Sequence, residues 1–315
     1  MMYLALAGGL IILLFCGDLL VRGAVALASR FGVHPLIIGL TVVAFGTSAP
    51  ELMVSVKAAL EGSPGISLGN IVGSNVANVL LVLGLPAIIY PTVCNQASIR
   101  RNTSMMVGST ILFVALCMTG MLTFWDGLIL FLLVIAFLLY SAHRARTSPA
   151  DAGLEDELDD ISGLPERVWA ICAFLAIGLL GLPLGAELVV EGATEIARRF
   201  GVSEATIGLT VISLGTSLPE LATTLVAAFR RQADVAVGNV IGSNLFNILA
   251  IGGITAMVVP LPVSEAFLEF DLWVMLASAL LVVPFAFLRA TITRFAGAVF
   301  TVLYVSFLVT VFHMS

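Results

Sequence analysis

The chain has 315 residues, of which 60% are hydrophobic and only 11% are charged, and its formal net charge is −6. A soluble domain of ordinary composition carries about a quarter charged residues. The composition therefore excludes an ordinary soluble enzyme or binding domain and indicates a polytopic membrane protein. Its apolar runs are continuous over about 20 residues rather than alternating in ten-residue strands, so we expect an all-α membrane fold.

Ten apolar segments predict ten transmembrane helices. The first has no basic stretch before it and no clear small-residue cleavage site, so we interpret it as a retained helix rather than a signal peptide. In chain order the predicted spans are residues 3–28, 33–59, 66–90, 103–122, 124–142, 167–195, 203–229, 234–259, 271–289 and 292–313.

A short acidic segment divides the predicted spans into two groups of five. Residues 1–142 form the first five-helix group, residues 143–166 the linker, and residues 167–315 the second group. The linker acids do not match the spacing of an EF-hand loop. We therefore interpret the linker as a solvated cytoplasmic segment rather than a regulatory cation-binding segment.

The basic residues predict the orientation in the membrane. If the N-terminus is extracytoplasmic, eleven arginines fall on the cytoplasmic side and three basic residues on the other, which together are all 14 Lys and Arg residues. This split fits the positive-inside rule for a cytoplasmic (inner) membrane protein with both termini outside. The cytoplasmic set is Arg22, Arg30, Arg100, Arg101, Arg144, Arg146, Arg167, Arg230, Arg231, Arg289 and Arg294, and the opposite set is Lys57, Arg198 and Arg199.

One sequence pattern occurs twice, at a constant offset of 169 residues. Residues 28–85 and 197–254 align without a gap and are identical at 26 of 58 positions. Because each half holds five predicted spans, the second copy would enter the membrane from the opposite side, which makes the repeats inverted. We therefore expect the two copies to meet near the middle of the bilayer.

Each copy contains the sequence Gly-Thr-Ser-x-Pro-Glu, at residues 46–51 and 215–220. Proline has no N–H and clashes with the carbonyl four residues earlier, so the helix is expected to open and to leave carbonyls without helical partners. Such backbone is tolerated in a membrane only where it lines a cavity or is buried in protein. Glu51 and Glu220 end the two motifs, and an intramembrane carboxylate indicates a functional site.

Each copy also contains Gly-Asn-x-x-Gly-Ser-Asn-x-x-Asn, at residues 69–78 and 238–247. Two glycines four residues apart let helices approach closely. The Ser and the final Asn of each motif are four residues apart and project from one helical face. These side chains are Ser74 with Asn78 and Ser243 with Asn247, while Asn70, Asn75, Asn239 and Asn244 are expected to cap and brace the broken turns.

The candidate ligands of both motifs are all oxygen donors. Neither motif contains the His or Cys that copper or zinc would favour. Oxygen ligands with two negative charges suit Ca²⁺ and can also hold Na⁺. Two uncompensated carboxylates repel each other in a low dielectric, and either one divalent or two monovalent cations would remove that repulsion. Purely structural polar packing is therefore disfavoured for the paired motifs, although Thr41 and Thr210 are expected only to bond to their own helices.

The first and sixth spans repeat each other faintly. Asp18 and Arg22 lie four residues apart and are expected to form an ion pair on one helical face. Their counterparts at the 169-residue offset, Glu187 and Glu191, are both acidic. We interpret them as a local ion pair in one half and a mouth-facing acidic pair in the other. The four scattered cysteines are interpreted as packing residues without a disulfide.

The duplicated motifs GTSxPEL and GNxxGSNxxN resemble the α-repeats of the sodium/calcium exchanger family, within the cation/Ca²⁺ exchanger superfamily. The chain is most similar to the short prokaryotic members. The resemblance implies ten helices, with the second, third, seventh and eighth forming a core past which the long first and sixth helices slide. It also implies Glu51 and Glu220 as Ca²⁺ ligands, side chains of Ser48, Ser217, Ser74, Ser243, Asn78 and Asn247 at flanking Na⁺ sites, and backbone carbonyls of Ala44, Thr47, Ser213 and Thr216 to complete them. For the two threonines, the carbonyl is expected to be the main contribution.

Within the superfamily, the residue pattern favours Na⁺-coupled exchange. The K⁺-dependent branch has Asp where this chain has Asn78 or Asn247, and the signature of the proton-coupled branch is missing. Ser213 stands where the first copy has Ala44, so the two Na⁺ sites need not be equivalent. An H⁺- or K⁺-linked Ca²⁺ exchanger remains the alternative, and a cation channel is the alternative from another class. We expect no enzyme activity, no cofactor apart from the transported ions, no nucleic-acid partner, and function as a monomer in the bilayer.

Overall fold

The computed structural model describes residues 2–94, 96–147, 163–200, 213–265 and 267–314. Seven helices in these ranges are long and apolar enough to cross a membrane, and a bent helix pair, Pro35–Thr47 with Ala49–Leu60, makes an eighth if it is counted as one span. The prediction of an all-α polytopic membrane protein is confirmed. The described residues do not establish the predicted count of ten spans.

The first half of the chain consists of ten helical elements. They are α1 (Met2–Phe31), α2 (Pro35–Ile38), the π-helix η1 (Gly39–Val43), α3 (Ala44–Thr47), α4 (Ala49–Leu60), α5 (Pro64–Ala77), the π-helix η2 (Asn78–Leu83), α6 (Gly84–Ile89), α7 (Ala97–Cys117) and α8 (Phe124–Thr147). Helix α7 coincides with a predicted span but starts earlier and includes Arg100 and Arg101, so its composition is less apolar than that of the other long helices.

The described part of the second half follows the same order. Its elements are α10 (Val168–Arg199), α12 (Ser213–Thr216), α13 (Leu218–Phe229), α14 (Ala233–Leu245), the π-helix η4 (Phe246–Ile251), α15 (Gly252–Val258), the π-helix η5 (Phe267–Asp271), α16 (Leu272–Phe287) and α17 (Arg294–Met314). Of the predicted span 203–229, only the part from Ser213 onward is described. Residues 148–162 of the predicted linker also lie outside the described residues, as does Thr210.

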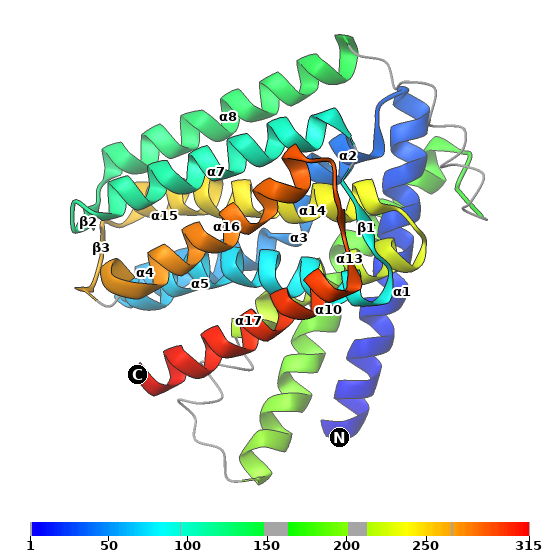
Figure 1. Cartoon of the computed structure of the whole chain (residues 1–315). Helices are drawn as coiled ribbons and strands as arrows, with labels where there is room; N and C mark the ends of the chain where they lie inside the picture. Colours follow the sequence, from blue (N-terminus) through cyan, green and yellow to red (C-terminus); the bar gives the residue numbers. More distant parts are fainter. Residues whose placement is uncertain (1, 95, 148–162, 201–212, 266, 315) are drawn as a thin grey trace.

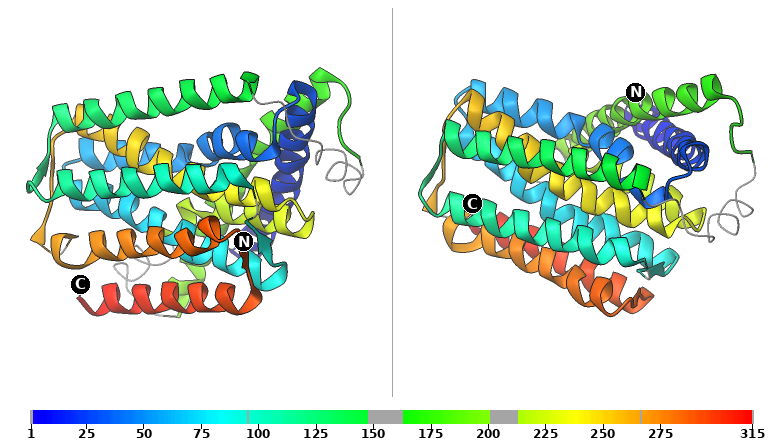
Figure 2. Two further views of the ribbon diagram at one scale, coloured as in Figure 1. Left: turned by 45° about the horizontal axis from the view of Figure 1, so that its top comes forward. Right: turned by 90° about the horizontal axis from the view of Figure 1, so that it is seen from above.

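Helices α1 and α10 stand apart from the others in direction. Most of the remaining helices lie side by side, whereas α1 and α10 cross them steeply and extend beyond them (Figures 1 and 2). Gly9 of α1 lies against Gly185, and Leu20 lies against Gly178, so the residue numbers fall along α10 as they rise along α1. The two helices are therefore antiparallel. A Cβ atom at Gly9 would lie 2.7 Å from the Gly185 carbonyl oxygen, which shows how closely they pack.

The helices that carry the second motif form the centre of the fold. The apolar windows of the continuous helices 64–89 and 233–258 are 78% and 89% buried, whereas those of the other long helices are 17–39% buried. Their inward faces form one large apolar cluster that includes Ile71, Val76, Val240 and Leu245. The motif residues are thus held where side chains have least room to move.

Helix α14 packs on α2 and η1 through two glycines, as its small-xxx-small spacing predicts. A Cβ atom at Gly238 would lie 2.7 Å from the Leu36 carbonyl oxygen, and one at Gly242 would lie 2.6 Å from the Ala44 Cβ. The sequence counterparts of Leu36 and Leu40 at the 169-residue offset, residues 205 and 209, lie outside the described residues. The close approach is therefore confirmed for the second copy only.

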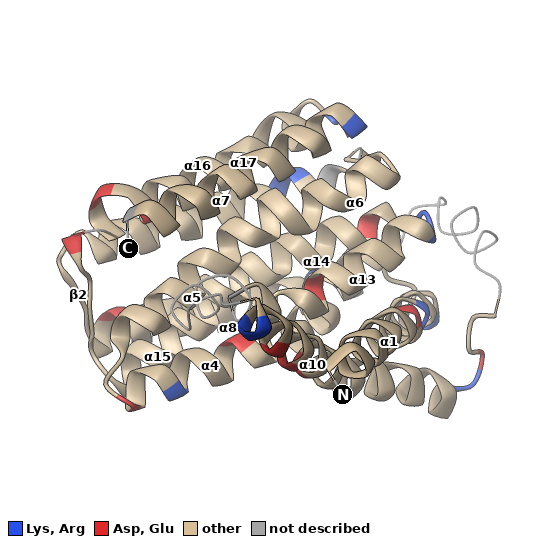
Figure 3. Cartoon of the chain, turned by 90° about the horizontal axis from the view of Figure 1, so that it is seen from below, with Lys and Arg blue, Asp and Glu red and all other residues tan. Residues whose placement is uncertain are grey.

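Two short antiparallel ribbons connect the halves at opposite ends of the molecule (Figure 1). Strand β1 (Thr92–Val93) pairs with β4 (Thr291–Ile292), with Thr92 opposite Ile292. Strand β2 (Met121–Leu122) pairs with β3 (Leu261–Pro262) at the other end. Acidic segments gather around β2, whereas several basic segments lie towards the opposite end, beyond α13 and along α1 (Figure 3). The sequence analysis did not predict these ribbons, because each strand is only two residues long.

We predict that Gly238→Ala destabilises the protein, whereas Gly108→Ala does not. Both glycines lie inside helices, but a methyl group at Gly238 would overlap the backbone of α2, while one at Gly108 would meet no heavy atom within 4 Å. Overpacking of this kind costs ~1–3 kcal/mol, whereas replacing an exposed helical glycine by alanine is neutral or stabilising. Thermal unfolding of the two variants in detergent measures the difference, and equal melting temperatures would contradict the proposed packing.

Candidate cation-binding site

Both Gly-Thr-Ser-x-Pro-Glu motifs interrupt their helices at the serine. Ser48 separates α3 from α4 with φ −85° and ψ 5°, and Ser217 separates α12 from α13 with φ −87° and ψ 3°. The helix axis bends by 41° at Ser48. Pro50 and Pro219 lie in the first turn of the following helices, where a missing N–H costs no helical hydrogen bond. The predicted break is thus present in both copies and has the same backbone geometry.

The break at Ser48 is a bend rather than a wide opening. The Ser48 N–H donates to the Ala44 carbonyl at 3.0 Å, and the Thr47 hydroxyl, whose one proton is shared with Asn239 Oδ1, lies 3.3 Å from the same oxygen. The expectation that the turn leaves its carbonyls without partners is therefore not met at Ala44. The physical reason is that proline removes only its own donor, so the neighbouring N–H groups keep their bonds. At the second break the Ser217 N–H donates to the Leu214 carbonyl at 3.1 Å instead.

Glu51 and Glu220 lie in the first turns of α4 and α13. Their residues are 1% and 0% exposed, respectively, so both acids are buried inside the protein. The N-terminal end of a helix carries a partial positive charge, which favours a carboxylate there. The bend thus places each acid at the N-terminal end of a helix, where a carboxylate is stabilised, and neither acid is exposed to lipid.

The two copies meet at these acids, as the inverted arrangement predicts. The Ser48 hydroxyl of the first copy donates to Glu220 Oε1 of the second copy at 3.1 Å, and Ser243 donates to the same oxygen at 3.5 Å. Ser48 lies three residues before Glu51 at the same break, so this contact brings the two acidic motifs into one region. Among the described residues, neither acid forms an ion pair with a basic side chain. Two negative charges are therefore gathered in one buried region.

Many buried polar atoms of the two motifs accept and donate no hydrogen bond within the described part of the chain. An unsatisfied buried polar group costs ~1–3 kcal/mol, and native proteins contain only a few. A hard cation would satisfy the oxygen atoms of this set, because it takes six to eight such ligands. The atoms are both carboxylate oxygens of Glu51, Oε2 of Glu220, the hydroxyls of Ser74 and Ser217, and both side-chain polar atoms of Asn78 and Asn247.

A reciprocal pair of hydrogen bonds joins the two copies beside the acids. The Thr47 hydroxyl donates to Asn239 Oδ1 at 3.3 Å, and the Thr216 hydroxyl donates to Asn70 Oδ1, also at 3.3 Å. Each bond runs from the broken turn of one copy to the second motif of the other copy. We call these four residues the threonine–asparagine clasp.

The asparagines of the clasp also hold the acids in place. Asn70 Nδ2 donates to the Glu51 carbonyl at 3.0 Å, and Asn239 Nδ2 donates to the Glu220 carbonyl at 3.4 Å. The same amide groups reach Ser55 at 2.8 Å and Thr224 at 3.1 Å. The prediction that Asn70 and Asn239 brace the broken turns is confirmed. The clasp uses the hydroxyls of both threonines, while the expectation that the threonines offer mainly carbonyls stays a prediction.

The prediction of bracing is wrong for the other two asparagines. Asn75 donates to the Ile71 carbonyl of its own helix at 2.7 Å, and Asn244 contacts Met106 Sδ at 3.6 Å. Both lie one residue after the serine of the motif, on a helical face that points away from the breaks. Thr41 does bond to its own helix, through the Ile37 carbonyl at 2.7 Å, as predicted.

Widened helical turns follow the second motif in both copies. Asn78 begins the π-helix η2, and Asn247 lies in the π-helix η4. Single π-turns inside α-helices are frequent at functional sites because they displace one residue outward from the regular spiral. The sequence analysis missed them, since no residue pattern distinguishes a π-turn from an α-turn.

A cavity of about 1050 Å³ opens beside the second break. Helices α4, α10 and α12 line it, and it extends from Lys57 and Glu61 to Thr216. Glu187 also lines it, and both Glu187 and Glu191 are exposed, while the interpretation of the two as an acidic pair at a mouth stays a prediction. The cavity therefore connects one end of the molecule with the neighbourhood of the clasp.

Comparisons with known proteins agree with this architecture. A profile of the family described as sodium/calcium exchanger protein matches residues 1–142 and 170–313. The sodium/calcium exchanger MaX1 of Methanosarcina acetivorans is 31% identical over 99% of both chains. The inner membrane protein YrbG of Escherichia coli is 37% identical over 80% of this chain and 78% of its own.

The fold is also that of a solved exchanger. A structure of the sodium-calcium exchanger NCX_Mj, soaked with zero Na⁺ and Ca²⁺, has a TM-score of 0.85 and 33% identity, covering 99% of this chain and 100% of that chain. The profile match covers more than half of the chain and includes both motif copies. The chain therefore belongs to the sodium/calcium exchanger protein family.

Proposed function

We propose that this protein is a secondary antiporter that exchanges Na⁺ for Ca²⁺ across the cytoplasmic membrane by alternating access. The observation that carries the proposal is the pairing of Glu51 with Glu220. Both acids are buried, they come from the two copies of one motif, and no basic side chain of the described residues pairs with them. Both carboxylate oxygens of Glu51 and several buried oxygen atoms of the same motifs have no hydrogen-bond partner among the described residues.

The charge of this pair explains why exchange is favoured over one-way transport. Desolvating an uncompensated charge costs several kcal/mol, so the empty, doubly negative site is unfavourable. One Ca²⁺ or two Na⁺ ions would neutralise the same two charges. A protein that changes its access only when the site is neutralised must then trade one kind of cation for the other.

The proposed ligands fall into two groups. Glu51 and Glu220 would bind Ca²⁺ from opposite sides. Side-chain oxygens of Ser48, Ser217, Ser74, Ser243, Asn78 and Asn247 would form flanking Na⁺ sites together with the carbonyls of Ala44, Thr47, Ser213 and Thr216. At Ala44 a bound Na⁺ would share an oxygen that already accepts hydrogen bonds from Ser48 and Thr47.

For the topology we propose ten transmembrane helices in two inverted five-helix repeats, residues 1–142 and 167–315, joined by the cytoplasmic linker 143–166. Equivalent breaks at Ser48 and Ser217 and the antiparallel packing of α1 against α10 support this arrangement. The distribution of arginines supports extracytoplasmic termini. Because one chain supplies both acids, we propose that the monomer is functional.

An H⁺-linked Ca²⁺ exchanger is the second candidate, since two protons would also neutralise two buried carboxylates. K⁺ linkage is less favoured because Asn78 and Asn247 carry no charge. A cation channel would need a continuous pore, whereas the described residues offer a buried site between bent helices.

We predict that purified protein in proteoliposomes takes up ⁴⁵Ca²⁺ when Na⁺ is high inside and low outside, without K⁺ on either side. Uptake driven equally well by a pH gradient alone would favour the H⁺-linked exchanger. Ca²⁺ currents that persist without any counter-ion would favour the channel.

We predict that Glu51→Gln and Glu220→Gln each abolish Ca²⁺ uptake, with a loss of at least about 100-fold. Each substitution keeps the shape of the side chain but removes half of the negative charge, and polar interactions of one charged group are typically ~1.5–3 kcal/mol or more. Glu195→Gln is the matched control, because Glu195 lies on α10 and its Arg199 partner, at 3.2 Å, is on the same helix. If either site variant takes up Ca²⁺ at the rate of the control, that acid is not part of the binding site.

A further inference from the structure

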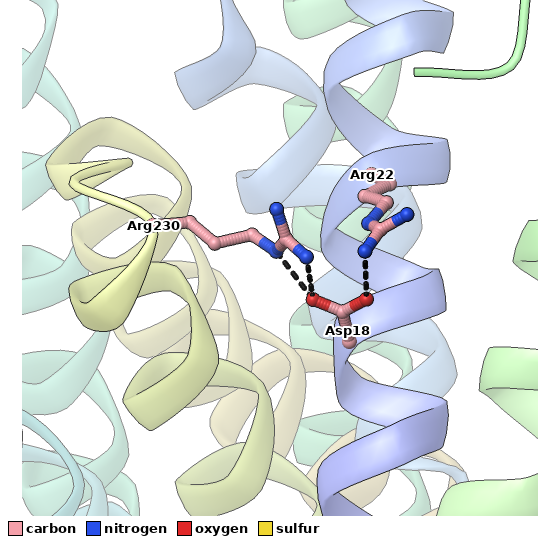
Figure 4. A network of polar contacts seen from close by, with 3 residues as sticks. All are labelled: Asp18, Arg22 and Arg230. Carbon is pink, nitrogen blue, oxygen red and sulfur yellow. Dashed lines mark hydrogen bonds and ion pairs between the residues drawn. The ribbon is translucent and has the colours of Figure 1, made fainter. Parts of the chain in front are cut away.

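Asp18 of α1 forms an ion-pair network that reaches the helix carrying Glu220 (Figure 4). Its Oδ2 atom accepts from Arg22 at 2.8 Å, which confirms the predicted pair within α1. Its Oδ1 atom accepts from Arg230, which caps the C-terminal end of α13 and lies 212 residues away in sequence. The sequence analysis missed Arg230, because nothing in the chain indicates which surface α1 meets.

Beside this ion pair, α1 meets α13 through small and apolar residues. A Cβ atom added at Gly17 would lie 3.4 Å from the Ala222 carbonyl oxygen and from the Val226 side chain, which is ordinary van der Waals contact. Val21 and Val25 continue this surface in a cluster that includes Val226. Small apolar residues define a register only weakly, since neighbouring turns offer similar packing. The bond from Asp18 to Arg230 is therefore the contact that specifies the register.

Sliding α1 by one helical turn, about 5.4 Å, would break that register in either direction. In one direction Leu14 would take the place of Asp18 and offer no charge. In the other direction Arg22 would face Arg230, and two cations would repel each other. The side chains of Asp18, Arg22 and Arg230 are only 25%, 26% and 20% exposed, so water screens these interactions less than at an open surface.

The repeat-related positions at the other end of the molecule carry the opposite arrangement of charge. The counterpart of Arg230 at the 169-residue offset is Glu61, which caps α4 with nearly the same backbone angles. The counterpart of Asp18 is Glu187. Both glutamates line the 1050 Å³ cavity. Thus a carboxylate faces an arginine where the helices are in contact, and two carboxylates occupy the equivalent positions where the molecule is open.

The two positions are well separated along the helix pair. Glu187 lies two residues from Gly185, which contacts Gly9 of α1. Asp18 is nine residues beyond Gly9, which is about 14 Å along the helix. The ends of α4 and α13 also lie at opposite ends of the molecule (Figure 1). The ion pair of Asp18 with Arg230 and the two carboxylates therefore lie at opposite ends of the molecule (Figure 1).

We propose that Asp18 and Arg230 are positioning residues for the exchange cycle, forming a latch that holds α1 and α10 in the register that opens the cavity. Glu61 and Glu187 add to this bias, because two carboxylates, one of them 3.9 Å from Lys57, form no ion pair that would favour closing that side. The unequal charges thus bias two otherwise similar arrangements of the repeats. This inference rests on the proposed alternating access, since a rigid protein would not use a latch.

The test is the accessibility of one cysteine in the cavity. Val190 lines the cavity, so Val190→Cys is introduced after the exposed Cys172 is replaced by serine. The rate of its reaction with a maleimide is then measured in purified protein in nanodiscs. We expect Asp18→Asn and Arg230→Gln to lower this rate about threefold or more, because loss of the latch lowers the population of the cavity-open register.

Arg22→Gln is the matched control, since Arg22 contacts the same carboxylate but lies on the same helix. Its labelling rate should stay within about twofold of the parent rate, because an ion pair within one helix contributes little free energy. The double variant D18R/R230D should restore the parent rate. Parent-like labelling of Arg230→Gln, or failure of the swap to restore it, would overturn the latch.

A second variant avoids any folding defect at the latch itself. Glu61→Arg leaves Asp18 and Arg230 intact but would attract Glu187, so it should also lower the labelling of Val190→Cys. An unchanged or higher rate would overturn the proposal. Labelling needs no transported ion, so the two proposals can fail separately. If the variants change the labelling rate as expected but the protein exchanges no ions, only the proposed function is wrong. If the protein exchanges ions but the labelling rate is unchanged, only the latch is wrong.

Discussion

The central physical constraint is the burial of two like charges in the interior of a membrane protein. Glu51 and Glu220 are nearly inaccessible, and the described residues supply no basic partner. Helix N-terminal ends and two serine hydroxyls at Glu220 offset only part of the desolvation of two carboxylates. The remaining charge must be balanced by ions from outside the chain, and this requirement connects the architecture with cation exchange.

The remaining features around the acids hold them at a fixed position despite their repulsion. The threonine–asparagine clasp ties each broken helix to the opposite copy, and its amide groups bind the carbonyls of the two glutamates. The glycines of α14 bring the copies close enough for these bonds to form. In the proposed alternating-access cycle, buried central helices and small apolar contacts with α1 would let the outer pair move without distortion of the site.

Much of the candidate site could be predicted from the sequence, because each motif occurs twice and a pattern found in both copies is more specific than the same pattern found once. The proline breaks, the two acids and the bracing role of Asn70 and Asn239 follow from local rules applied twice. The local rules failed where tertiary geometry decides the outcome. The carbonyl of Ala44 keeps its hydrogen bonds, Asn75 and Asn244 point elsewhere, and Arg230 reaches Asp18 across 212 residues. The π-turns at Asn78 and Asn247 leave no mark in the residue pattern at all.

The most direct test is to locate a Ca²⁺-like ion in crystals of the protein by the anomalous scattering of Sr²⁺. The account predicts one strong peak between Glu51 and Glu220, within about 2.3–2.8 Å of oxygen atoms from both side chains, which weakens as Na⁺ is raised. A peak bound by only one of the two acids, or a peak elsewhere with none between them, would contradict the account.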